Sequence, residues 1–428
     1  MEADGFYDLS SFGWDGCKIP TDLVDICKYV PNWRHLKVIR RPQILNGAHV
    51  YFPVRYFESR GQLYMPAFMK GDSVDDGGYA DIFRGRRAIF KPVSDALTGT
   101  VRLEKEGSFS EICIKHISLN ISAEEDAARD DVRQRIYEDE INAILYEAFL
   151  HTILLKTLES VGFASAVPHI YEVIASTKKQ TPTSPIDFES IWISMEFIQG
   201  QTLEKYLSAQ LRPEAKERNE AILLDVLIQL AFYLQILQDK VRFNHRDLKV
   251  NNVFTRIHAP DERWSRIINV PGIGDWSCTQ DIVIIDFGFS CVACGSGFPN
   301  PRATLIGAGS WFRAEDDCLK YGRDLCQFLY SIHSMFPLQN YVRDAFFDII
   351  HNAMVAHKGG RAFDLMMGID ESGSPRPGTR LPPTVDFHDG VYIFLRQEDL
   401  DVPGCNPREF LTRLATTASK EGLKPLAA

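Results

Sequence analysis

The sequence predicts a mixed α+β protein in which a small antiparallel sheet with one long helix precedes a larger, mainly helical part. Between residues 71 and 117, short apolar runs alternate with glycine and charged turns, which is typical of antiparallel strands. From residue 126 to 160 the apolar residues recur every three and four positions, which indicates an amphipathic helix. After Gly200 the pattern is largely helical.

Composition narrows the class of protein. The chain has 428 residues, 45% of them hydrophobic and 24% charged, as in an ordinary soluble protein with a sizeable core. The net charge of −10 and the lack of a long basic run argue against nucleic acid as the main partner. The densest basic cluster, Arg84 to Arg87, is interpreted as a solvated turn.

The sequence also predicts an intracellular, cytoplasmic protein without a membrane partner. Residues 1–5 have neither a basic nor an apolar signal segment. The most apolar stretch, 221–237, is interrupted by Asp225, Gln229 and Gln235, which suits a core helix better than a membrane span. Nine unevenly spaced cysteines favour reduced thiols over a disulfide framework.

The order of elements gives the domain organisation. We expect an N-terminal extension of unknown role at 1–70, a first domain at 71–197 and a second at 198–428. Strands are predicted at 80–83, 88–90, 112–117, 170–175, 191–197, 253–254 and 282–285, and further helices at 203–209, 220–239, 324–336, 341–357 and 407–415.

Two short motifs carry the chemistry. His245-Arg246-Asp247-Leu248-Lys249-Val250-Asn251-Asn252 follows a predicted helix, and Asp286-Phe287-Gly288 follows a predicted strand. Together they resemble the catalytic loop and metal-binding motif of the eukaryotic-type serine/threonine protein kinases. The resemblance implies a bilobal kinase-like fold, with the sheet in the N-lobe and the helices in the C-lobe.

The resemblance also implies phosphoryl transfer from Mg-ATP to serine or threonine hydroxyls of proteins. Asp247 would orient the substrate hydroxyl, and Lys249 would neutralise charge on the moving phosphoryl group. Asn252 and Asp286 would hold Mg²⁺, which prefers oxygen ligands. The protein substrate itself is not predicted.

The nucleotide-binding residues are expected in the first domain. Residues 75–82 match the family's glycine-rich loop in part. Lys115, in Cys113-Ile114-Lys115, resembles the lysine that binds ATP phosphates, and Lys91 is its rival. The residues of the expected loop are Gly77, Gly78, Tyr79, Ala80 and Ile82.

Other family positions have candidates as well. Glu147 on the long helix would pair with the lysine, although Glu140 shares nearly the same helix face. In the hinge that follows Met195, the backbone groups of Glu196 and Ile198 would contact adenine. Phe254 would lie beneath the base.

The chain also departs from the family. Asp286 follows Asp247 by 39 residues, which is longer than usual, so the second domain is expected to contain an insertion at 255–280. The Ala-Pro-Glu motif has no clear counterpart. Asp324 resembles the aspartate that braces the catalytic loop. The pattern is similar to divergent kinases of large DNA viruses. Two other functions remain open, a pseudokinase acting as a scaffold or allosteric partner, and a small-molecule phosphotransferase of related fold.

Overall fold

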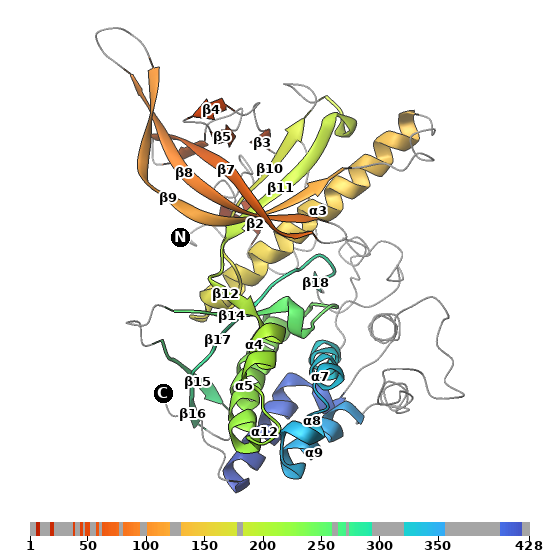
Figure 1. Ribbon diagram of the computed structural model, residues 1–428. Helices are drawn as coiled ribbons and strands as arrows, with labels where there is room; N and C mark the ends of the chain where they lie inside the picture. The colour runs from red at the N-terminus through yellow and green to blue at the C-terminus, as the bar shows by residue number, and fades with distance from the viewer. Residues whose placement is uncertain are drawn as a thin grey trace. The chain divides into compact units, whose positions relative to one another are not determined.

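In the computed structural model the chain divides into two units (Figure 1). The first contains residues 1–152 and 168–198, and the second contains 153–167 and 199–428. The mixed α+β class predicted from the sequence is confirmed. The structure describes residues 6–8, 18–20, 37–38, 43–45, 48–51, 57–59, 62–76, 80–94, 101–119, 130–177, 183–258, 264–270, 274–292, 321–355 and 403–421.

An antiparallel sheet of five long strands forms the centre of the first unit. Its order is β10 (Ile170–Thr177), β11 (Phe188–Glu196), β9 (Val101–Ser118), β8 (Asp81–Ser94) and β7 (Gln62–Asp76). The predicted boundary at residue 70 falls inside β7. Shorter strands are β3 (Lys37–Val38) beside β10, β5 (Ala48–Tyr51) and β4 (Gln43–Leu45) beyond β7, β6 (Phe57–Ser59) paired with β7, and the separate pair β1 (Phe6–Asp8) and β2 (Lys18–Pro20).

Side chains of β9 alternate between the two faces of this sheet, as the period of a strand requires. Ile112 and Ile114 pack with Ile174 and Trp192 in one buried cluster. Lys115, the residue after Ile114, bonds a side chain of α3 (Asp130–Glu159). This places α3 beside the opposite face, as the ribbon also shows (Figure 1).

The interpretation of Arg84 to Arg87 as a turn was wrong, because these residues lie in the middle of β8. A Cβ on Gly85 would lie 2.7 Å from Ile114 Cδ1 and 2.9 Å from the Met69 carbonyl oxygen, so the glycine permits close packing of strands. Arg87 is largely buried and its guanidinium donates to the Glu172 carboxylate at 2.6 Å. Arg87 therefore contributes to sheet packing, whereas Arg84 and Arg86 are exposed.

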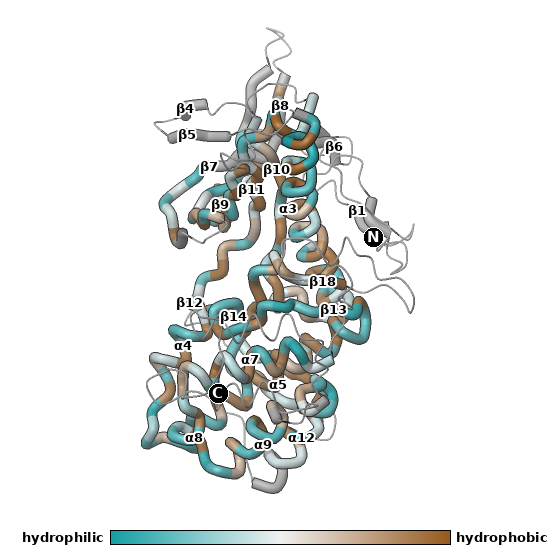
Figure 2. The backbone as a smooth tube through the Cα atoms, turned by 90° about the vertical axis from the view of Figure 1, so that its right-hand side faces the viewer, coloured by the Kyte–Doolittle hydropathy of each residue, from teal (hydrophilic) through white to brown (hydrophobic). Residues whose placement is uncertain are grey.

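The second unit is mainly helical. The central α5 (Lys216–Val241) is apolar along most of its length, shown in brown in Figure 2, and packs against α12 (Pro407–Glu421). By length and composition α3 and α5 could each cross a membrane, but 78% and 83% of their most apolar windows are buried, as in core helices. Among the described residues, this unit also contains α4 (Leu203–Gln210), α7 (Arg323–Met335), α8 (Leu338–Tyr341) and α9 (Asp344–Val355).

Short strands frame the two sequence motifs. β12 (Gly200–Thr202), β14 (Val253–Arg256) and β17 (Asp281–Ile284) form one small sheet, and β13 (Phe243–Asn244) pairs with β18 (Cys291–Val292). The loop 245–249 connects β13 to the 3₁₀ turn Val250–Asn252 before β14. Residues 285–290 connect β17 to β18. Both motifs therefore follow strand ends in the same unit.

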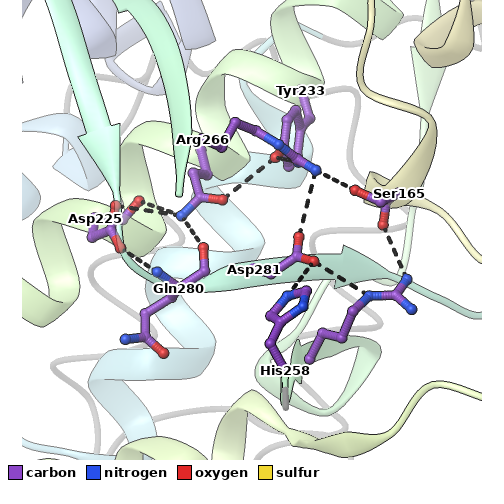
Figure 3. A network of polar contacts seen from close by, with 9 residues as sticks. Ser165, Asp225, Tyr233, His258, Arg266, Gln280 and Asp281 are labelled. Carbon is purple, nitrogen blue, oxygen red and sulfur yellow. Dashed lines mark hydrogen bonds and ion pairs between the residues drawn. The ribbon is translucent and has the colours of Figure 1, made fainter. Parts of the chain in front are cut away.

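The predicted insertion forms a hairpin of β15 (Arg266–Val270) and β16 (Gly274–Cys278). Its polar contacts with α5 are drawn in Figure 3. Asp225 accepts hydrogen bonds from Trp276 Nε1 at 3.2 Å and from the Thr279 and Gln280 N–H groups at 2.9 Å each. The hairpin is thus fastened to the core helix.

The second half of this network surrounds Asp281, whose carboxylate is buried. Arg256 Nε lies 3.3 Å and His258 Nε2 lies 3.0 Å from Asp281 Oδ2, and Arg266 Nη2 lies 3.6 Å from Oδ1. Arg266 also donates to the Tyr233 and Ser165 hydroxyls (Figure 3). Three basic side chains therefore surround one buried carboxylate.

The expectation of reduced thiols holds for part of the chain. Cys113, Cys278, Cys326 and Cys405 are free thiols. Cys291 was wrongly included, because it is disulfide-bonded to a cysteine outside the described residues. The spacing of the nine cysteines in the sequence could not predict this disulfide, because the fold determines which cysteines meet.

Candidate functional site

The backbone of the loop 245–249 is held by one buried carboxylate. Asp324, at the start of α7, is fully buried, and its Oδ2 accepts from Asn244 Nδ2 at 3.0 Å and from the His245 N–H at 2.8 Å. Its Oδ1 accepts from the Arg246 N–H at 2.9 Å. Arg246 has a φ of 66°, a left-handed conformation that is uncommon outside glycine. The expected bracing by Asp324 is confirmed.

Two further side chains of α7 bond the same loop. Gln327 Oε1 accepts from the Leu248 N–H at 3.2 Å, and Ser331 Oγ accepts from the Val250 N–H at 3.0 Å. Both side chains are buried. With Asp324 they stand at i, i+3 and i+7, which places them along one side of the helix.

The side chains expected to carry the chemistry converge between these anchors. Asn252 Nδ2 donates to the Asp247 carbonyl oxygen at 2.8 Å and lies 3.2 Å from Asp247 Oδ2. Lys249 Nζ lies 3.1 Å from the same Oδ2 and is about one-third exposed. The Asp247 carboxylate is therefore buried beneath an amide donor and a cation.

Asp286 is tied to this loop through its neighbours in the chain. The Ile285 N–H donates to the Asn252 carbonyl oxygen at 3.0 Å, and His245 Nε2 lies 3.0 Å from the Ile285 carbonyl oxygen. Asp286 itself is exposed and has a φ of 62°. Such conformations occur preferentially at functional sites.

Phe287 anchors the residues that follow Asp286. Its ring is buried, with centroids 5.5 Å from that of His245 and 6.4 Å from that of Phe243. A buried aromatic at this position fixes the turn that presents the neighbouring carboxylate to solvent.

The donor set fits a magnesium ion. Asn252 uses its amide nitrogen for Asp247, so its side-chain oxygen is the atom that would face a metal. Asp286 contributes an exposed carboxylate. Both are hard oxygen ligands, and Mg²⁺ is commonly held by one or two such side chains together with substrate phosphates. Within the described residues, His, Cys, Asp and Glu form no cluster of three suited to a metal.

The first unit contains the predicted lysine and its glutamate partner. Lys115 Nζ lies 2.5 Å from Glu147 Oε1, and both side chains are largely buried. Glu140 lies two turns earlier on α3. The rival Lys91 lies on β8 in register with Glu104. The structure thus brings together the pair that was favoured.

The other predicted nucleotide contacts are placed in part. β7 and β8 pair Asp76 with Asp81, so the expected glycine-rich loop is their connection. Ala80 is buried and Ile82 half-buried, but Gly77, Gly78 and Tyr79 lie outside the described residues. At the predicted hinge, the Glu196 N–H donates to the His169 carbonyl oxygen at 2.7 Å. Ile198 and the predicted base contact Phe254 are half-buried.

Sequence reasoning missed Gln327 and Ser331. The available signal was a polar residue at each of positions 324, 327 and 331 on a helix whose other buried positions are mostly apolar. Polar residues at helical spacing on a buried face require buried partners. The identity of those partners, backbone N–H groups nearly 80 residues earlier, is set by the tertiary fold alone.

Comparison with known proteins adds no relative. The sequence matches no protein-family model. No curated protein gives a significant match either.

Proposed function

We propose that this chain is a protein kinase that transfers the γ-phosphoryl group of Mg-ATP to serine and threonine hydroxyls of proteins, on a bilobal kinase-like fold. One observation carries the proposal. The Asp247 carboxylate lies within 3.2 Å of both Asn252 Nδ2 and Lys249 Nζ, on a loop bonded to the segment before Asp286. A positioned carboxylate, a cation and two metal ligands are the parts that phosphoryl transfer needs.

Each side chain of the second unit has a distinct role in this proposal. Asp247 orients the substrate hydroxyl and accepts its proton, and Lys249 compensates negative charge on the transferred group. Asn252 and Asp286 hold magnesium, which supplies charge neutralisation at the phosphates when bound. Asp286 is exposed and has a left-handed backbone, whereas the next residue, Phe287, is buried.

The nucleotide contacts come from the first unit and from β14. Lys115, oriented by Glu147, binds ATP phosphates. Because the Glu196 N–H is engaged with His169, adenine would contact the Glu196 carbonyl oxygen and the backbone of Ile198. The remaining contacts proposed are Gly77, Gly78, Tyr79, Ala80 and Ile82 over the phosphates and Phe254 under the base.

Two substitutions test the proposal. In an assay with γ-labelled ATP and protein substrates from a cell lysate, we expect Asp247→Asn to lower the rate by about 10²–10⁴, the usual contribution of a positioned acid or base. Asp286→Ala should lower it at least as much, because it removes a metal ligand. Circular dichroism and thermal unfolding check that both variants fold.

The same experiment separates the alternatives. A pseudokinase would transfer no phosphate in the wild type, and binding of ATP would not depend on magnesium. A small-molecule phosphotransferase would leave no phosphoserine or phosphothreonine in acid hydrolysates of the proteins. Wild-type transfer that both variants retain would contradict the assigned roles.

A further inference from the structure

We propose that Gln327 and Ser331 are positioning residues for the phosphoryl-transfer loop, and that they act on the rate through Asp247 and Lys249. This inference rests on the proposed function. It extends that function to two side chains of α7 that no motif in the sequence marks.

The anchored and the reactive positions alternate along the loop. α7 bonds the N–H groups of residues 246, 248 and 250 through Asp324, Gln327 and Ser331. Asp247 and Lys249 lie between those anchors. The backbone N–H groups on both sides of each reactive residue are therefore bonded to α7. In this way the helix fixes the position of the backbone from which the reactive side chain extends.

The anchors are rigid because they are buried. Leu248 and Val250 are buried to at least 98%, as are Gln327 and Ser331, so water cannot replace a lost acceptor without entering the core. Loss of an acceptor would instead let the backbone move. A displacement of about 1 Å at reacting atoms costs up to about 10²-fold in rate.

The side chain of Gln327 contributes to the loop through its oxygen atom. Its Nε2 is buried and has no hydrogen-bond partner among the residues that the structure describes. A buried unpaired donor costs stability, which an apolar residue of the same size would avoid. Methionine would fill the same space but would lack the oxygen atom that accepts the hydrogen bond from the Leu248 N–H.

The test uses two acceptor deletions and a matched control. Ser331→Ala and Gln327→Met remove one acceptor each with little change in shape. Ser334→Ala, one turn further along α7, removes a hydroxyl that bonds the helix's own Ser331 carbonyl oxygen at 3.0 Å. We expect kcat to fall about tenfold or more in both deletions, with the KM for ATP within about twofold of wild type.

A double-mutant cycle distinguishes positioning from general loss of structure. In an Asp247→Asn background, Ser331→Ala should change the residual rate by less than about twofold, because the residue through which it acts is already gone. Ser331→Thr, which keeps the hydroxyl, should restore most of kcat. A purely structural role would lower kcat equally in both backgrounds.

Amide hydrogen exchange tests whether Gln327 and Ser331 hold the loop, and it needs no measurement of activity. We expect faster amide exchange over residues 246–252 in Ser331→Ala and Gln327→Met, and wild-type exchange in Ser334→Ala. An active wild type with unchanged kcat in both deletions would overturn the inference. A wild type that transfers no phosphate refutes the proposed function and the catalytic part of the inference, while the exchange data still show whether the two side chains hold the loop.

Discussion

Removal of the Asp324 carboxylate should destabilise the second unit strongly. Three donors at 2.8–3.0 Å, the Asn244 amide and the His245 and Arg246 N–H groups, lose their acceptor in Asp324→Ala. Each buried donor left unpaired costs about 1–2 kcal/mol, so the free energy of unfolding should fall by about 3–6 kcal/mol. At about 2–4 °C per kcal/mol, the melting temperature should fall by roughly 6–24 °C.

Asp324→Asn offers a graded comparison. The amide keeps one acceptor oxygen but presents N–H donors where the other oxygen stood, so we expect about half of the loss. Asp239→Ala is the matched control, because its carboxylate is half exposed and bonds the exposed Arg408 at 2.9 Å. Such a pair contributes at most about 1 kcal/mol.

Urea unfolding followed by far-UV circular dichroism measures all three variants. The reasoning would be refuted if Asp324→Ala lowered the free energy of unfolding by no more than Asp239→Ala does. It would also be refuted if amide exchange in residues 244–246 stayed at the wild-type rate. Either result would mean that the loop keeps its conformation without the carboxylate.

Two further predictions concern backbone packing and pH. Gly200→Ala should lower the melting temperature while the exposed Gln199→Ala should not, because a Cβ on Gly200 would lie 2.1 Å from the Thr255 carbonyl oxygen and force β12 away from β14. His151, which bonds the Pro168 carbonyl oxygen, has a pKa lowered to about 4 by burial, so its contribution to stability is full above about pH 6.5 and is lost as the pH falls toward 4. Urea unfolding at pH 7 and pH 4.5 should show a pH-dependent loss of up to about 3 kcal/mol that is absent in His151→Gln.

Elements with a strong local pattern could be predicted from the sequence. The helix expected at 126–160 is observed as Asp130–Glu159, and the strands around the two motifs are observed within about two residues. The contact of Lys115 with Glu147 could be anticipated because strand order and helix periodicity limit which side chains can meet. Local periodicity alone left Glu140 open.

Other features depend on contacts that no local pattern encodes. Arg87 looked like part of a charged turn because its partner, Glu172, lies 85 residues away on another strand. Asp225 and Gln229 were correctly interpreted as interruptions in a core helix. The groups that they bond lie at Trp276, Thr279 and Gln280, in a segment whose sequence showed only extra length. Long-range hydrogen bonds of this kind appear only when the chain is folded.

The polar contacts of the hairpin limit how this chain could be shortened. Excision of residues 264–278 would bring the spacing between Asp247 and Asp286 closer to the usual spacing of the two motifs. It would also remove Arg266, which contacts Asp281, and Trp276, which donates to Asp225. Both carboxylates are at least 98% buried, so each would remain in the interior with fewer compensating donors. A shortened chain could therefore lose the inserted segment without this cost only if Asp225 and Asp281 were replaced as well.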